Sequence, residues 1–113
     1  MPIVIEMRTY KAKPGMRQRV MEILVERSFP AFRQIGMSVL GPFSSVEDPD
    51  VFFWMRGFPD LPSREAMRNE FYEGVLWNTE LEGLILPLIE HYEAVVVEDP
   101  AHQLGPAFQG ASG

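Results

Sequence analysis

The sequence has no cysteine among its 113 residues. Disulfides, thiol nucleophiles, thiolate metal sites and iron–sulfur clusters are therefore excluded. Histidine is scarce as well, because only His91 and His102 are present, and no group of carboxylates has the spacing of metal ligands. We therefore expect no metal site. The sequence also lacks a glycine-rich phosphate loop and a nucleophile elbow, which argues against nucleotide binding and serine-hydrolase chemistry.

Basic residues are too few and too scattered to form a cationic surface patch. Lysine and arginine number 10 against 16 acidic residues, and the formal net charge is −6. We therefore expect neither nucleic acid nor an anionic membrane surface as a partner. No apolar run reaches the length of a membrane span, and the first residues enter a strand pattern without a signal-peptide leader. These features predict a cytoplasmic protein.

Hydrophobic periodicity divides the chain into strands and helices. The predicted strands cover residues 3–10, 37–46, 51–58 and 88–98, and the predicted helices cover the stretch between Pro14-Gly15 and Gly36, then 64–72, with a shorter helical piece within 75–88. Pro30 lies inside the first helix, so we expect that helix to kink or restart near Phe29. Asp60 or Ser63 is expected to cap the second helix.

This β-α-β-β-α-β order predicts a ferredoxin-like α+β domain, a four-stranded antiparallel sheet with both helices on one face. The domain is expected to span residues 1–98, and residues 99–113 are predicted to form an extended or disordered tail because they lack periodicity. In the strand 51–58, Phe52 and Trp54 point one way while Phe53 and Met55 point the other. The helices cover only one face, so we predict a homodimer that packs sheet to sheet.

Three segments of the chain and one tryptophan carry a resemblance to a known family. They read "IEMRTYKAKPG", "FPAFRQIGM" and "LPSREAMRNEFY", followed by Trp77, and in this order they resemble the NIPSNAP family of the dimeric α/β-barrel superfamily. The resemblance implies a ferredoxin-like domain that dimerises into a barrel with its helices outside. The segment "EGVLW" (73–77) and the tail after Asp99 depart from the family pattern. Some barrel relatives bind haem through a helix histidine; neither helix here has one, so we expect no cofactor.

The first strand carries an unusual polar row, Glu6, Arg8 and Tyr10, between apolar neighbours. If the helices cover Ile3, Ile5 and Met7, this row faces the partner sheet, and a buried charge there must be paired. One interpretation is a structural ion-pair network that fixes the register of the dimer. The other is the polar lining of a ligand cavity.

In the cavity interpretation each polar residue has a role. Arg8 binds an anionic or carbonyl oxygen, Glu6 or His91 accepts a proton, and Tyr10 donates one. Arg56 on the third predicted strand joins the row. Alternatively, His91 is a hydrogen-bonded interface residue.

Trp54 and Trp77 are candidates to contact a flat apolar ligand, with Arg56 beside them. Core packing is the competing explanation for such aromatic residues. Relatives with this architecture suggest cofactor-independent chemistry, such as oxygenation or isomerisation, on a small organic or aromatic metabolite. The functional hypothesis is therefore a homodimer with a small-molecule site. The alternative is a non-catalytic binding or interaction protein whose polar row only stabilises the dimer.

Overall fold

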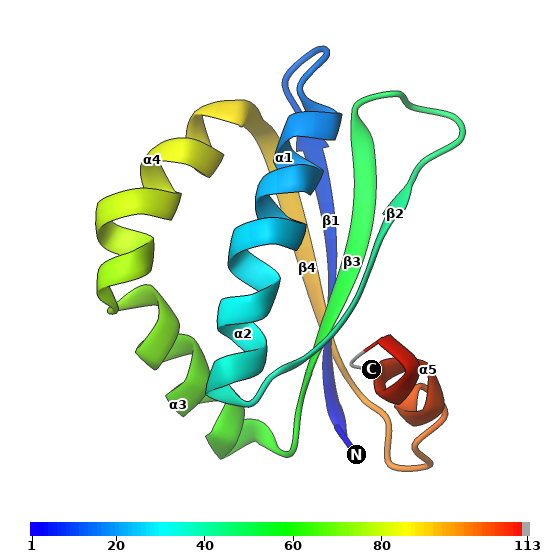
Figure 1. Ribbon diagram of the computed structural model, residues 1–113. Coiled ribbons are helices and arrows are strands. Elements are labelled where there is room, and N and C mark those ends of the chain that lie inside the picture. Colours follow the sequence, from blue (N-terminus) through cyan, green and yellow to red (C-terminus); the bar gives the residue numbers. More distant parts are fainter. Residues whose placement is uncertain (112–113) are drawn as a thin grey trace.

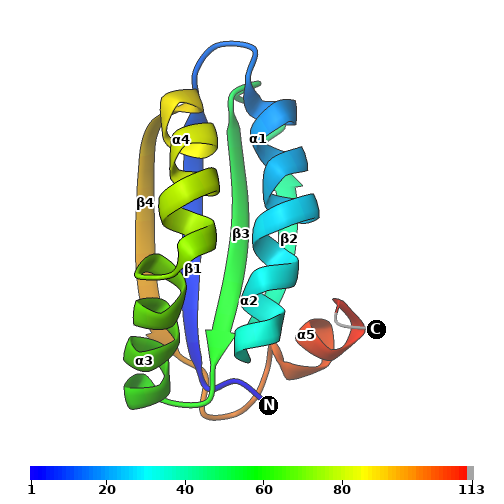
Figure 2. The same cartoon turned by 60° about the vertical axis from the view of Figure 1, so that its left-hand side comes forward.

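The computed structural model describes residues 1–111 and contains one antiparallel sheet of four strands in the order β2-β3-β1-β4 (Figure 1). The strands are β1 Val4–Ala12, β2 Ser38–Ser44, β3 Val51–Phe58 and β4 Ile89–Glu98. Two long helical stretches lie side by side on one face of this sheet (Figure 2). The ferredoxin-like α+β fold predicted from the sequence is thereby confirmed.

The first helical stretch is interrupted as the position of proline predicts. It consists of α1 Arg17–Ile23, the π-helical segment η1 Leu24–Ser28 and α2 Phe29–Ile35. Pro30 lies in the first turn of α2 directly after the π-helical segment, in which the amide of Phe29 donates to the carbonyl of Leu24. Gly36 ends the stretch with a φ of 116°, in the left-handed region that a side chain disfavours.

The second helical stretch also changes its winding partway along. It consists of α3 Leu61–Tyr72, the π-helical segment η2 Trp77–Leu81, α4 Glu82–Ile85 and the 3₁₀ turn η3 Leu86–Leu88. Asp60 caps α3, because its Oδ1 accepts a hydrogen bond of 2.8 Å from the backbone amide of Ser63. None of the helices in the described part of the chain combines the length and apolarity that a membrane span requires.

The inner face of the sheet, which the helices cover, carries the main core. Phe52, Trp54 and Phe58 of β3 are buried there among side chains from both helical stretches. On β1 the inner positions are Val4, Glu6, Arg8, Tyr10 and Ala12. The expectation that Ile5 and Met7 face the helices is therefore wrong, since both pack on the outer face with Met55.

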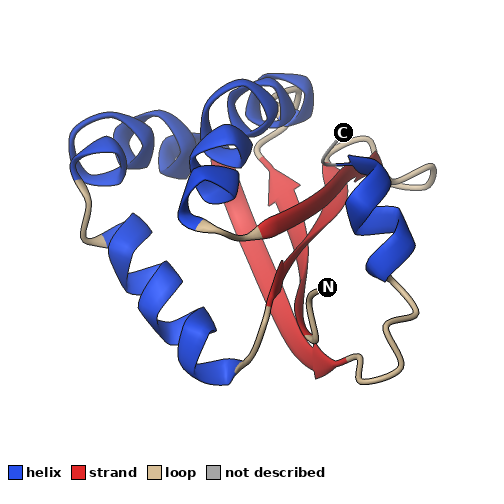
Figure 3. Ribbon diagram, turned by 60° about the horizontal axis from the view of Figure 1, so that its bottom comes forward, coloured by secondary structure: helices blue, strands red, loops and turns tan. Residues whose placement is uncertain are grey.

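The prediction of an extended or disordered tail over residues 99–113 is wrong for Gly105–Ala111, and its last two residues lie outside the described part of the chain. Residues Gly105–Ala111 form helix α5, which lies on the outer side of the sheet (Figure 3). The carboxylate of Asp99 accepts hydrogen bonds from the amides of Gln103 and Leu104 and so fixes the approach to α5. Phe108 is 1% exposed and packs with Ile5 and Met55. The buried side chain of Phe108 therefore holds α5 against the sheet, although the sequence of α5 has no hydrophobic periodicity that predicts a helix.

Candidate functional site

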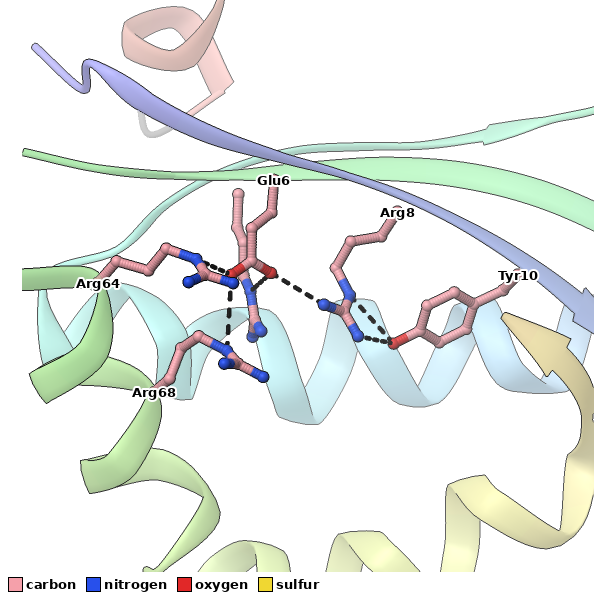
Figure 4. Close-up of polar contacts among 6 residues, drawn as sticks. Glu6, Arg8, Tyr10, Arg64 and Arg68 are labelled. Carbon is pink, nitrogen blue, oxygen red and sulfur yellow. Dashed lines mark hydrogen bonds and ion pairs between the residues drawn. The ribbon is translucent and has the colours of Figure 1, made fainter. Parts of the chain in front are cut away.

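A single buried carboxylate lies at the centre of the inner face. Glu6 is completely inaccessible to solvent, and four arginine side chains surround it (Figure 4). Its Oε1 lies 2.8 Å from Nη1 of Arg8 and 2.9 Å from Nε of Arg56. Its Oε2 lies 2.7 Å from Nε of Arg64 and 3.5 Å from Nε of Arg68. One residue of β1 thus connects β3 and α3 to the centre of the sheet.

Local geometry explains why these five side chains meet. Glu6 pairs directly with Arg56 in the antiparallel register of β1 and β3, so their side chains share one face. Arg8 is two residues along the same strand and also points inward. Arg64 and Arg68 are four residues apart on α3 and therefore project from the same side of that helix.

The arginine residues keep the Glu6 carboxyl ionised. Burial raises its pKa, but Arg56, Arg8 and Arg64 lower the pKa more, and the net result lies below the ordinary value of 4.5. The guanidinium of Arg56 is fully buried, and its two terminal nitrogens have no hydrogen-bond partner among the described residues. It lies 5.0 Å from the ring centre of Phe32 and 5.6 Å from that of Trp54, so aromatic faces stabilise it in part.

Arg8 and Tyr10 form the second half of the polar row. Nε and Nη2 of Arg8 donate to the hydroxyl of Tyr10 at 3.4 and 3.2 Å. Burial lowers the pKa of Arg8, but Tyr10, Tyr72 and Glu6 raise it above its ordinary value, so the guanidinium stays charged. Burial raises the pKa of Tyr10 and Arg8 opposes that rise only in part, so the phenol is neutral near pH 7. Its own proton remains free for a further acceptor.

A cavity of about 260 Å³ opens beside Arg8 and Tyr10, between the sheet and the helices. The side chains around it combine a few polar groups with many apolar and aromatic ones: Arg8, Tyr10, Leu24, Ser28, Phe32, Trp54, Arg68, Phe71, Tyr72, Trp77, Ile85, Leu86, Ile89 and Tyr92. Leu24 and Ser28 belong to η1, and Trp77 begins η2, so both π-helical segments contribute to the cavity wall. Such segments often accompany functional sites in helices.

Three residues that line the cavity have a buried polar atom without a hydrogen-bond partner in the described part of the chain. The atoms are Oγ of Ser28, Nε1 of Trp54 and Nε of Arg68, and the last of them lies 3.5 Å from Oε2 of Glu6. Buried polar groups in native proteins are nearly always satisfied.

Most residues predicted for the site do come together. Glu6, Arg8, Tyr10 and Arg56 form one network, and Trp54 and Trp77 line the adjoining cavity. The network lies beneath the helices, so the interpretation that it sets the register between two sheets is wrong. Those predictions assumed the opposite orientation of β1.

His91 does not join the site. It pairs with Lys11 on the outer face of the sheet, and its ring lies 3.2 Å from the exposed carboxylate of Glu93. Arg64, Arg68 and Ser28 were not predicted as site residues. The four-residue spacing of Arg64 and Arg68 was the available signal for these two, whereas nothing in the sequence pointed to Ser28.

We expect Glu6→Gln to lower the free energy of unfolding by about 3–5 kcal/mol at pH 7, because it leaves four guanidinium groups without their shared anion. Folding lowers the pKa of Glu6, so its contribution to stability is present above the ordinary value of 4.5 and is lost as the pH falls through the lowered value. The variant should lack this acid-dependent loss. Urea unfolding at several pH values measures both effects.

Glu65→Gln on the exposed side of α3 is the matched control, with an expected change within about 0.5 kcal/mol. Equal stability of Glu6→Gln and Glu65→Gln would contradict the central position assigned to Glu6.

Comparison with known proteins finds similarity in structure but not in sequence. No family model matches the chain, and no curated protein matches it. An uncharacterised NIPSNAP domain protein from Burkholderia xenovorans superposes with a TM-score of 0.77 at 21% identity, covering 88% of this chain and 96% of the other. A NIPSNAP family protein of unknown function from Agrobacterium tumefaciens superposes with a TM-score of 0.73 at 22% identity, covering 86% of this chain and 87% of the other.

A more distant structure has the same architecture. A putative antibiotic biosynthesis monooxygenase from Nitrosomonas europaea superposes with a TM-score of 0.69 at 12% identity, covering 87% of this chain and 90% of the other. Identities of this size show the fold and leave the activity open. The resemblance that the sequence motifs predicted is confirmed at that level: this chain has the fold of NIPSNAP family proteins.

Proposed function

We propose that this protein binds a small organic molecule in the cavity between the sheet and the helices. The observation that carries the proposal is the meeting of a buried charged donor, Arg8, and a neutral phenol, Tyr10, at the wall of that cavity. Both offer hydrogen bonds to one oxygen atom of a ligand.

The size and surface of the cavity define the body of the ligand. Its volume of about 260 Å³ lies just below the ~300–1,000 Å³ of sites that enclose drug-sized molecules, so it suits a small metabolite. Aromatic rings dominate the wall, including Tyr92, whose ring centre lies 5.6 Å from that of Tyr10. Flat, largely apolar molecules gain most from such walls.

Catalysis on the bound molecule is the second candidate. Arg8 and Tyr10 are placed to stabilise negative charge developing on a ligand oxygen, as oxyanion donors do. The fold neighbour described as a putative antibiotic biosynthesis monooxygenase suggests cofactor-independent oxygenation by analogy.

Proton abstraction is the weak point of this candidate. Glu6 is held ionised at a lowered pKa by its arginine partners, and His91 is on the other face of the sheet. Among the described residues, no carboxylate or imidazole lines the cavity. Binding without chemistry is therefore the function that the geometry supports best.

Self-association and location extend the proposal. We propose that a second copy packs on the part of the outer sheet face that α5 leaves open, where Val95 of β4 is 58% exposed and Phe43 of β2 is 49% exposed. Large exposed apolar side chains on one sheet face favour such packing. The predicted cytoplasmic location belongs to the same proposal and rests on the sequence pattern alone.

A thermal-shift screen of small aromatic and carbonyl metabolites tests the binding site. We expect at least one compound to raise the melting temperature of the parent protein by several degrees at a concentration of ~100 Kd, because ligand binding adds about 2.7 kcal/mol to the free energy of unfolding. Arg8→Ala and Tyr10→Phe should each reduce that shift.

Arg19→Ala is the control, since it removes an exposed arginine that is not part of the cavity wall. A parent protein that responds to no compound, or an Arg8→Ala and a Tyr10→Phe variant that both respond as strongly as Arg19→Ala, would overturn the proposal.

The dimer has a separate test. Val95→Asp places a charge on the exposed outer face, and we expect it to convert a dimer into a monomer in light-scattering measurements, because a buried unpaired charge is costly. Val46→Asp in the fully exposed loop before β3 introduces the same charge and should leave the mass unchanged. A parent protein that scatters as a single chain at micromolar concentration refutes the dimer without affecting the cavity within each chain.

A further inference from the structure

We infer that the ligand of the cavity is an organic carboxylate, a small flat acid whose carboxylate group binds the terminal nitrogens of Arg68. This inference rests on the proposed function and specifies the chemical class of its ligand. Three observations support it. The charges around Glu6 are unbalanced, the terminal nitrogens of Arg68 have no hydrogen-bond partner among the described residues, and Arg68 lines the cavity.

The arginine cluster is far from electrically balanced. Arg8, Arg56, Arg64 and Arg68 each have Glu6 as their ion-pair partner, and no other acidic residue in the described part of the chain pairs with them. One carboxylate therefore faces four guanidinium charges. The neighbouring aromatic rings stabilise cations through their faces but carry no negative charge. An anion bound beside the cluster would reduce the remaining repulsion.

Of the four arginine residues, Arg8 and Arg68 line the cavity. They differ in how many of their nitrogen atoms already donate hydrogen bonds within the protein. Nη1 of Arg8 donates to Glu6, while its Nε and Nη2 donate to Tyr10. Arg68 approaches Glu6 through Nε alone, at 3.5 Å, and no hydrogen bond to another described residue engages its terminal nitrogens. Figure 4 shows its guanidinium pointing away from the sheet, into the space that the helices enclose. Arg68 is therefore the open donor of the site.

The shape of the open donor favours a carboxylate. Two parallel N–H groups of a guanidinium match the two oxygens of a carboxylate in a bidentate pair. A phosphate group usually collects further donors from backbone amides at a helix N-terminus. The N-terminus of α3 instead holds the carboxylate of Asp60. The aromatic side chains Tyr72 and Trp77 continue the cavity wall beside Arg68, where the flat body of the acid would lie.

Matched acids and amides test the inference on the full chain. Isothermal titration with 2-naphthoate and benzoate, each compared with its neutral amide, separates the charge of the head group from the shape of the body. We expect the acids to bind at least roughly tenfold more tightly than the amides, since hydrogen bonds to charged groups are the stronger ones.

Two variants locate the effect. Arg68→Gln should weaken binding of the acid by roughly tenfold to a hundredfold and remove the preference over the amide. Arg64→Gln removes the same charge from the same helix and from the same carboxylate, but it lies outside the cavity wall. It should retain the preference, with affinity within roughly threefold of the parent. Circular dichroism confirms that both variants are folded.

The possible failures are distinguishable. Equal affinity for acid and amide, an unchanged preference in Arg68→Gln, or binding confined to phenyl phosphate would overturn the carboxylate inference. If the amide binds and Tyr10→Phe weakens it, the proposed binding function stands without the anionic head group. If none of these probes binds and the metabolite screen is also silent, both the inference and the proposed function fail.

Discussion

The structure depends on the buried carboxylate of Glu6. It is the one anion that four guanidinium groups share, and through them it joins two neighbouring strands to the helix α3. Aliphatic side chains at these positions would fill the same layer with less desolvation cost. The buried ion pairs therefore carry a desolvation cost that a gain in stability does not explain, whereas a role in ligand binding does. They position Arg8 and Arg68 at the wall of a cavity that is lined mostly by apolar and aromatic side chains.

The helices and strands were predictable because the residues that begin, end and pattern them lie close together in the sequence. Pro30 placed the restart of the first helical stretch at Phe29, and Gly36 placed its end. The orientation of β1 was predicted wrongly because each face of that strand carries apolar residues, so alternation alone does not choose between them. The face that turns toward the helices is set by the pairing of Glu6 with Arg56 and Arg64, which lie 50 and 58 positions away in the sequence. The displacement of His91 from the site follows from the same error.

Helix α5 and the composition of the cavity wall were also not predictable from local sequence patterns. Helix α5 is short and rich in glycine, proline and alanine, so it has no periodic pattern to detect, and Phe108 with the cap at Asp99 supplies its order. The cavity was expected from composition only in outline, since its wall includes Ser28 and Tyr92 from segments far apart in the sequence. The two faces of the sheet thus differ: the inner face carries the Glu6 network and the cavity, and the outer face is partly covered by α5.

A crystal structure of the protein grown with 2-naphthoate at neutral pH examines this account most directly. We predict that Glu6 lies among all four arginine residues, with the ligand carboxylate against the terminal nitrogens of Arg68 and its rings beside Trp77. An inner face in which Glu6 turns away from the arginine residues, or a cavity closed by collapsed aromatic side chains, would contradict it.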